Sequence, residues 1–165
     1  MIKINSLDII VPVFAALSCL LMLLQIPVWA LFIGWAWYYA LGARPELIIK
    51  GIAPTIVGSV LAFATFLLID VFAQGMPVIW ATVLAVFITV FLLMLSLKVP
   101  ALNLSLISFN AYSCIFVGYG AGAYLVIKGM PAMLNAAIWI SGANILGLVC
   151  GWLSICFSAV FSKSK

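Results

Sequence analysis

Polar side chains recur at helical spacing in two otherwise apolar stretches of the sequence, where they could line a route for a solute. The first row is Thr55, Ser59, Phe66 and Asp70. The second row is Ser105, Ser108, Tyr112 and Tyr119, and Asn110 is a further candidate beside it. Each hydroxyl group has an alternative role, because serine and threonine also hydrogen-bond across packed helices or back to their own helix.

An aromatic cluster in residues 28–41 is the second candidate feature. Trp35 and Tyr39 lie on one face of a helix, and an aromatic constriction passes small neutral molecules while it excludes hydrated ions. The alternative is an aromatic belt at the membrane surface, which suits the tyrosine better because it lies near a segment end. We therefore expect a route past Trp35 and Tyr112.

Residues that could support enzymatic chemistry are scarce. The chain has no histidine, no nucleophile elbow and no phosphate-binding loop. Its three carboxylates, Asp8, Glu46 and Asp70, fall at predicted segment ends, and its four cysteines lie inside apolar runs without a CxxC motif. We expect no enzyme, no metal site and no cofactor.

The composition is that of an integral membrane protein. Of the 165 residues, 68% are hydrophobic and 6% are charged, and the mean hydropathy is +1.42. A membrane helix needs about 20 apolar residues, so six would occupy nearly the whole chain. The predicted segments are residues 8–26, 28–41, 51–71, 77–97, 104–127 and 133–161. The sequence predicts one all-α membrane bundle over residues 1–165, in which the second segment is too short for a straight crossing.

The basic residues predict the orientation. With six crossings, one side carries Lys3, Arg44, Lys50, Lys98, Lys163 and Lys165, and the other carries Lys128 alone. Basic residues concentrate on the cytoplasmic side, so both termini are expected inside, in a bacterial inner membrane. Because these residues are scattered singly, we expect the lipid bilayer and a small solute as partners and no nucleic acid.

Two short motifs resemble each other. Lys50-Gly51-Ile52, followed by Pro54, is similar to Lys128-Gly129-Met130, followed by Pro131. This similarity indicates a three-plus-three inverted repeat with halves 8–72 and 77–161.

Glycines at four-residue spacing predict close helix packing. Gly118 and Gly122 form one pair, Gly147 and Gly151 form another, and Asn144 lies on the face of the second pair. Such faces also permit self-association, and we expect a homo-oligomer.

Val117-Gly118-Tyr119-Gly120 resembles the selectivity filter of potassium channels. The threonine that precedes this filter in the family is Phe116 here, and the acidic residue that follows it is Ala121. A potassium channel is therefore the least favoured alternative.

A resemblance covers most of the chain. The run Ile33-Gly34-Trp35-Ala36-Trp37-Tyr38-Tyr39-Ala40-Leu41-Gly42, the helix start at Lys50-Gly51-Ile52 and the Ser108-Phe109 pair before a glycine-rich segment resemble small bacterial inner-membrane proteins of the YcdZ type, a family of unknown function. The resemblance implies a bacterial inner-membrane setting and no particular substrate.

Because enzymatic residues are scarce and two rows of polar residues are present, the sequence favours a channel or facilitator for a small neutral solute of the urea, ammonia or short-amide class. One alternative is a secondary carrier built from inverted repeats. The other is a membrane subunit or scaffold that does not transport.

Overall fold

The computed structural model describes residues 4–163, and within this range all regular secondary structure is helical. The helices in chain order are α1 (Ser6–Ser18), η1 (Cys19–Leu24), α2 (Val28–Ala40), α3 (Glu46–Lys50), α4 (Ile52–Phe72), α5 (Val78–Ser96), η2 (Pro100–Leu102), α6 (Ser105–Gly120) and α7 (Ala132–Lys163). The predicted all-α bundle is confirmed.

Local sequence signals set several helix ends. At the start of α1 the Asn5 side chain accepts a hydrogen bond from the Asp8 amide, and the Asp8 carboxylate accepts one from the Asn5 amide. Pro27, Pro77 and Pro131 each precede a helix, where a missing amide hydrogen does least harm. These signals were readable in the sequence.

The predicted end of the fifth segment at residue 127 is wrong. α6 stops at Gly120, and Gly122 takes a φ of +64°, which ends the helix in a left-handed turn. The side-chain amide of Asn135 on α7 then binds this loop at two points. Its oxygen accepts a hydrogen bond from Ile127 N at 3.1 Å, and its nitrogen donates one to Met130 O at 3.1 Å.

Four helical stretches are long and apolar enough to cross a membrane: Ser6–Leu24, Glu46–Phe72, Val78–Ser96 and Ala132–Phe161. The other two, α2 and α6, have 13 and 16 residues. At 1.5 Å per residue they reach only about 20 and 24 Å, short of a hydrocarbon core of about 30 Å. The bundle therefore combines four long helices with two short ones.

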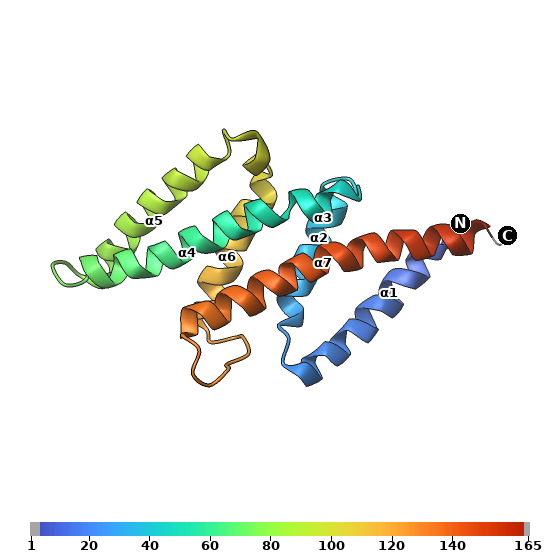
Figure 1. Cartoon of the computed structure of the whole chain (residues 1–165), viewed down its shortest axis with the longest axis horizontal. Coiled ribbons are helices and arrows are strands. Elements are labelled where there is room, and N and C mark those ends of the chain that lie inside the picture. Colours follow the sequence, from blue (N-terminus) through green and yellow to red (C-terminus); the bar gives the residue numbers. More distant parts are fainter. Residues whose placement is uncertain (1–3, 164–165) are drawn as a thin grey trace.

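The long helices form two V-shaped pairs, α5 with α4 and α1 with α7 (Figure 1). From the open end of α5 the chain returns through α6, which packs along α4. From the open end of α1 it returns through α2, which packs along α7. Each short helix thus lies against a long helix from the other half of the sequence.

This exchange of partners is consistent with an inverted repeat, and the repeat itself stays a prediction. The motif from which it was predicted is not reproduced in the backbone. Gly51 has a φ of −77° at the α3–α4 junction, whereas Gly129 has a φ of +85° in a loop.

The connecting segments gather at two ends of the bundle. Figure 1 shows the 41–51 and 97–104 connections on the side of the termini, and the 25–27, 73–77 and 121–131 connections on the opposite side. We call these the termini side and the Lys128 side. Arg44, Lys50 and Lys98 lie on the termini side, while Lys3 and Lys165 fall outside the described residues.

Candidate functional site

The two rows of polar residues predicted on α4 and α6 do meet, but they meet as a closed seam. A Cβ atom added at Gly58 would overlap Ser108 O and lie 3.0 Å from Tyr112 N. The ring of Phe66 packs on Phe116 at a centroid distance of 5.0 Å. Because the two backbones touch through a glycine, no solute can pass between these helices in this conformation.

A buried cluster of hydroxyl groups joins three helices beside this seam. Thr65 Oγ1 on α4 lies 2.8 Å from Thr89 Oγ1 on α5 and 2.7 Å from the Tyr112 hydroxyl on α6. Each threonine Oγ1 atom also lies 2.9 Å from a carbonyl oxygen of its own helix, that of Leu61 or Ala85. Since every polar atom of the cluster has a partner, it acts as interhelical hydrogen bonding.

The two hydroxyl groups of the α4 row, those of Thr55 and Ser59, form hydrogen bonds within the protein. Thr55 donates to Gly51 O at 2.8 Å, and Ser59 lies 2.7 Å from Ser141 Oγ on α7. The hydroxyl of Ser108, in contrast, is buried without a hydrogen-bond partner among residues 4–163.

The other candidates lie away from the core or in packing contacts. Asp70 and Ser105 are exposed, Asp70 two residues before the end of α4 and Ser105 at the start of α6. Asn110 donates to Leu106 O in its own helix at 2.7 Å. Tyr39 bonds the Ser154 hydroxyl, which joins α2 to α7. Tyr119 packs its ring on Phe66 at 4.8 Å.

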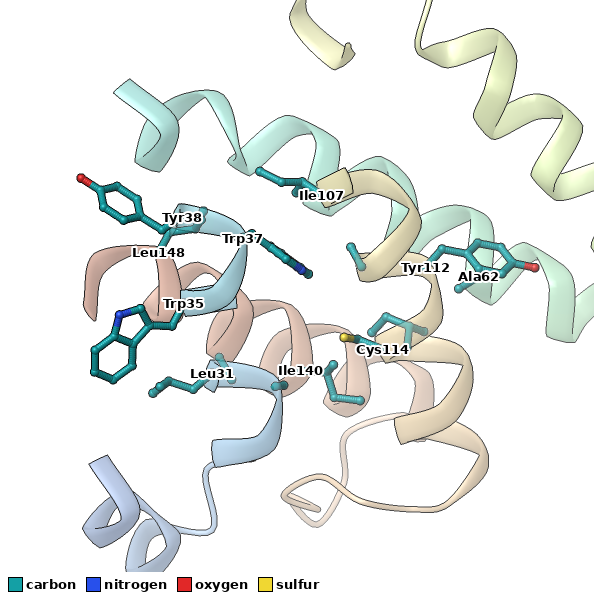
Figure 2. Packing of buried hydrophobic residues seen from close by; sticks show 14 of the residues in the cluster. Leu31, Trp35, Trp37, Tyr38, Ala62, Ile107, Tyr112, Cys114, Ile140 and Leu148 are labelled. Atoms are coloured by element: carbon teal, nitrogen blue, oxygen red, sulfur yellow. The ribbon is translucent and has the colours of Figure 1, made fainter. Parts of the chain in front are cut away.

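Trp35 and Tyr112 do not share a pathway. Figure 2 shows the Trp35 indole directed away from α6, and the Tyr112 phenol on the far side of α6, directed toward α4. Both side chains are buried, with 4% and 6% of their surface exposed. The expected route past them is absent from this conformation because each ring fills a separate interhelical contact.

Glycines hold α2 directly on α7. A Cβ atom at Gly34 would overlap Asn144 O, one at Gly147 would lie 2.6 Å from Trp35 N, and one at Gly151 would lie 2.8 Å from the Tyr38 ring. Gly118 packs on Trp29 in the same way. Gly122 lies beyond the end of α6 with open space around its Cα, so its predicted packing role is wrong.

A polar position lies at the centre of the protein, where α2, α6 and α7 meet. Asn144 Nδ2 donates to Ala30 O at 2.7 Å and lies 3.7 Å from the Cys114 sulfur. The Asn144 Oδ1 atom is buried and has no partner within the described range 4–163. Figure 2 shows the Trp37 indole directed from α2 toward α6, with the Cys114 sulfur facing the same core.

The indole nitrogen of Trp37 is also buried, and among the described residues it too has no hydrogen-bond partner. Trp37 Nε1 is thus a free donor and Asn144 Oδ1 a free acceptor, and the other buried polar atoms without a partner among residues 4–163 belong to Trp35, Tyr38, Ser108 and Trp139. An unpaired polar group costs several kcal/mol in an apolar environment, roughly 2–7 kcal/mol by transfer measurements. The buried polar side chains of residues 4–163 are serine, threonine and asparagine, without a charged one.

A groove of about 570 Å³ is formed by residues of the connections on the Lys128 side and of the helices beside them. It lies between the α1–α2 turn and the loop after α6, and it is lined by Cys19, Met22, Gln25, Ile26, Pro27, Val28, Trp29, Phe32, Ala123 and Tyr124. Burial, and to a lesser degree the neighbouring Tyr119, raises the pKa of Tyr124 above its usual value. The groove lining contains no aspartate, glutamate, lysine, arginine or histidine.

Sequence reasoning missed Trp37, Cys114 and Trp29 as residues of a candidate site. Asn144 was identified for packing only. A signal was present, because an asparagine in the middle of an apolar 32-residue helix is costly unless it has a partner. The contribution of Trp37 depends on which face of a short helix turns inward, and the uniformly apolar α2 does not encode that face.

Large apolar side chains cover the outside of the bundle, among them Leu23, Ile49, Trp80 and Phe87. Together with the four long apolar helices, they define a polytopic integral membrane protein. The chain matches the family described as protein of unknown function (DUF1097) over residues 8–159, and it belongs to this family. Searches of curated proteins and of solved structures found no match. The YcdZ-type assignment within the family stays a prediction.

Proposed function

We propose that this protein is a facilitator that moves a small uncharged solute of the urea or short-amide class through the core between α2, α6 and α7. The observation that carries the proposal is the pair of unpartnered buried atoms, Trp37 Nε1 and Asn144 Oδ1. A urea or amide molecule has a carbonyl oxygen for the first atom and an N–H group for the second.

The charge distribution supports a neutral solute. The carboxylate of Asp70 is exposed at the end of α4, and the described core contains no charged side chain that would bind an ion or relay a proton. Ion-coupled carriers ordinarily keep ionisable groups at membrane depth.

Passage requires movement, because glycine contacts seal the core. The short helices α2 and α6 are the elements that would move, since neither is long enough to be anchored at both membrane surfaces. The proposal is thus a gated facilitator and not a permanently open pore.

We also propose that the protein lies in a bacterial inner membrane with both termini in the cytoplasm. Arg44, Lys50 and Lys98 on the termini side, against Lys128 on the other, support this orientation.

The test is stopped-flow light scattering on proteoliposomes, with urea, formamide, acetamide and ammonia as solutes and potassium flux as a control. Faster equilibration of urea or amides than in protein-free vesicles is expected. Flux of ammonia alone would contradict a solute of the urea or short-amide class. Flux of potassium would contradict the proposal that the solute is uncharged. Absence of all flux would favour a scaffold or subunit, which the sealed α4–α6 seam would suit.

A further inference from the structure

We propose that Trp29 is the gate between the groove on the Lys128 side and the core that holds Trp37, Cys114 and Asn144. This inference rests on the proposed function, because it assigns the entrance of the same route. The groove alone is only a surface hollow. Its relation to α6 makes it an entrance.

Trp29 lies where the groove ends and the core begins. Its side chain lines the groove, and its indole ring lies over Gly118 of α6, where an added Cβ would be 2.8 Å from the ring. Its indole nitrogen donates to Ala123 O at 3.4 Å, in the loop that forms the other wall of the groove. One side chain therefore joins α2, α6 and the loop.

Cys114 lies one helical turn before Gly118 on the same face of α6. The two positions face successive turns of α7. Gly118 meets Ile140, and Cys114 meets Asn144 four residues further along. A molecule that enters past the Trp29 ring thus reaches the Cys114 thiol and the Asn144 amide next.

The geometry also explains why a tryptophan can swing here. Gly118 offers no side chain to grip the ring, and the ring is held by a single long hydrogen bond to Ala123 O. Trp29 is also one of the residues that line the groove of about 570 Å³, into which we propose that the ring moves.

The test uses Cys114 as the reporter, in the full-length protein in lipid nanodiscs with Cys19, Cys150 and Cys156 changed to alanine. A water-soluble methanethiosulfonate reagent is added, and modification of Cys114 is followed by mass spectrometry. In Trp29→Ala the thiol should react about tenfold faster than with Trp29 present, which corresponds to opening that is easier by about 1.4 kcal/mol.

Two further variants serve as a second perturbation of the gate and as a control. Gly118→Ala would place a methyl group 2.6 Å from Ile140 Cδ1 and 2.8 Å from the Trp29 ring, so that both side chains must shift, and it should raise the rate in the same direction without loss of a large side chain. Trp80→Ala removes an exposed tryptophan from α5 and should leave the rate unchanged. Unchanged Cys114 reactivity in folded Trp29→Ala and Gly118→Ala proteins would overturn the gate.

Solute flux is measured on the same variants, so that the two proposals fail separately. If Cys114 becomes accessible but no solute moves, the gate stands and the proposed function is wrong. If urea or amides move but Cys114 does not respond to Trp29→Ala, the function stands and the gate is wrong.

Discussion

Gly34 of α2 lies directly against the main-chain carbonyl group of Asn144 on α7, so close that a methyl group on Gly34 would overlap the carbonyl oxygen. The contact fixes the distance between the two helices that enclose the core. It also makes Asn144 structural through its backbone, while the Oδ1 atom of its side chain has no partner among the described residues.

Gly34→Ala should destabilise the protein, because the Cβ atom meets backbone, which cannot rotate away. Overpacking costs about 1–3 kcal/mol and sometimes more. Gly142→Ala is the control, since that helical glycine of α7 has nothing within 4 Å of its added Cβ. It should gain about 0.5–1 kcal/mol from helix propensity. Unfolding in detergent measures both, and equal stability of the two variants would contradict the packing described.

Tyr112→Phe should lower stability slightly and leave solute flux unchanged, because the Tyr112 hydroxyl belongs to the Thr65–Thr89 cluster and not to the proposed route. Interhelical hydrogen bonds in membranes contribute about 0.6 kcal/mol on average. A double-mutant cycle with Thr65→Val should show that the two losses are not additive. A large loss of flux in a folded Tyr112→Phe protein would contradict the proposed route and would indicate that the solute passes along the α4–α6 seam.

Cysteines at positions 98 and 128 should be labelled from opposite sides of the membrane, in a chain whose own cysteines are replaced by alanine. A membrane-impermeant maleimide added to intact bacterial cells should label Lys128→Cys at once. It should label Lys98→Cys only after the inner membrane is permeabilised. The reverse pattern would show that the termini lie outside the cytoplasm.

Much of the fold was predictable because apolar runs indicate the helices and the prolines and glycines between them indicate where helices end. The all-helical bundle, the shortness of residues 28–41 and the closely packed pair Gly147 and Gly151 were readable in the sequence, while the number of membrane crossings stays a prediction. The early end of α6 was not. It depends on the left-handed turn at Gly122 and on loop bonds made by Asn135, eight residues beyond Ile127.

The site was less predictable, because almost every side chain in this chain is apolar and the inward face of a helix leaves little pattern. The rows through Ser59 and Ser108 lie on helices that pack together, but the glycine at position 58 closes the seam between these helices. The meeting of Trp37 with α6 and α7 depends on the crossing of α2, which no local pattern specifies. The homo-oligomer stays a prediction.

The most direct test of the account compares urea and formamide equilibration in proteoliposomes that contain wild type, Trp37→Phe, Asn144→Leu or Trp80→Phe. Removal of the Trp37 donor or the Asn144 acceptor leaves a bound amide unpaired, which costs about 1–3 kcal/mol, or roughly tenfold to a hundredfold in rate. The account predicts this loss for the first two variants and wild-type flux for Trp80→Phe. Wild-type flux in folded Trp37→Phe and Asn144→Leu proteins would contradict it.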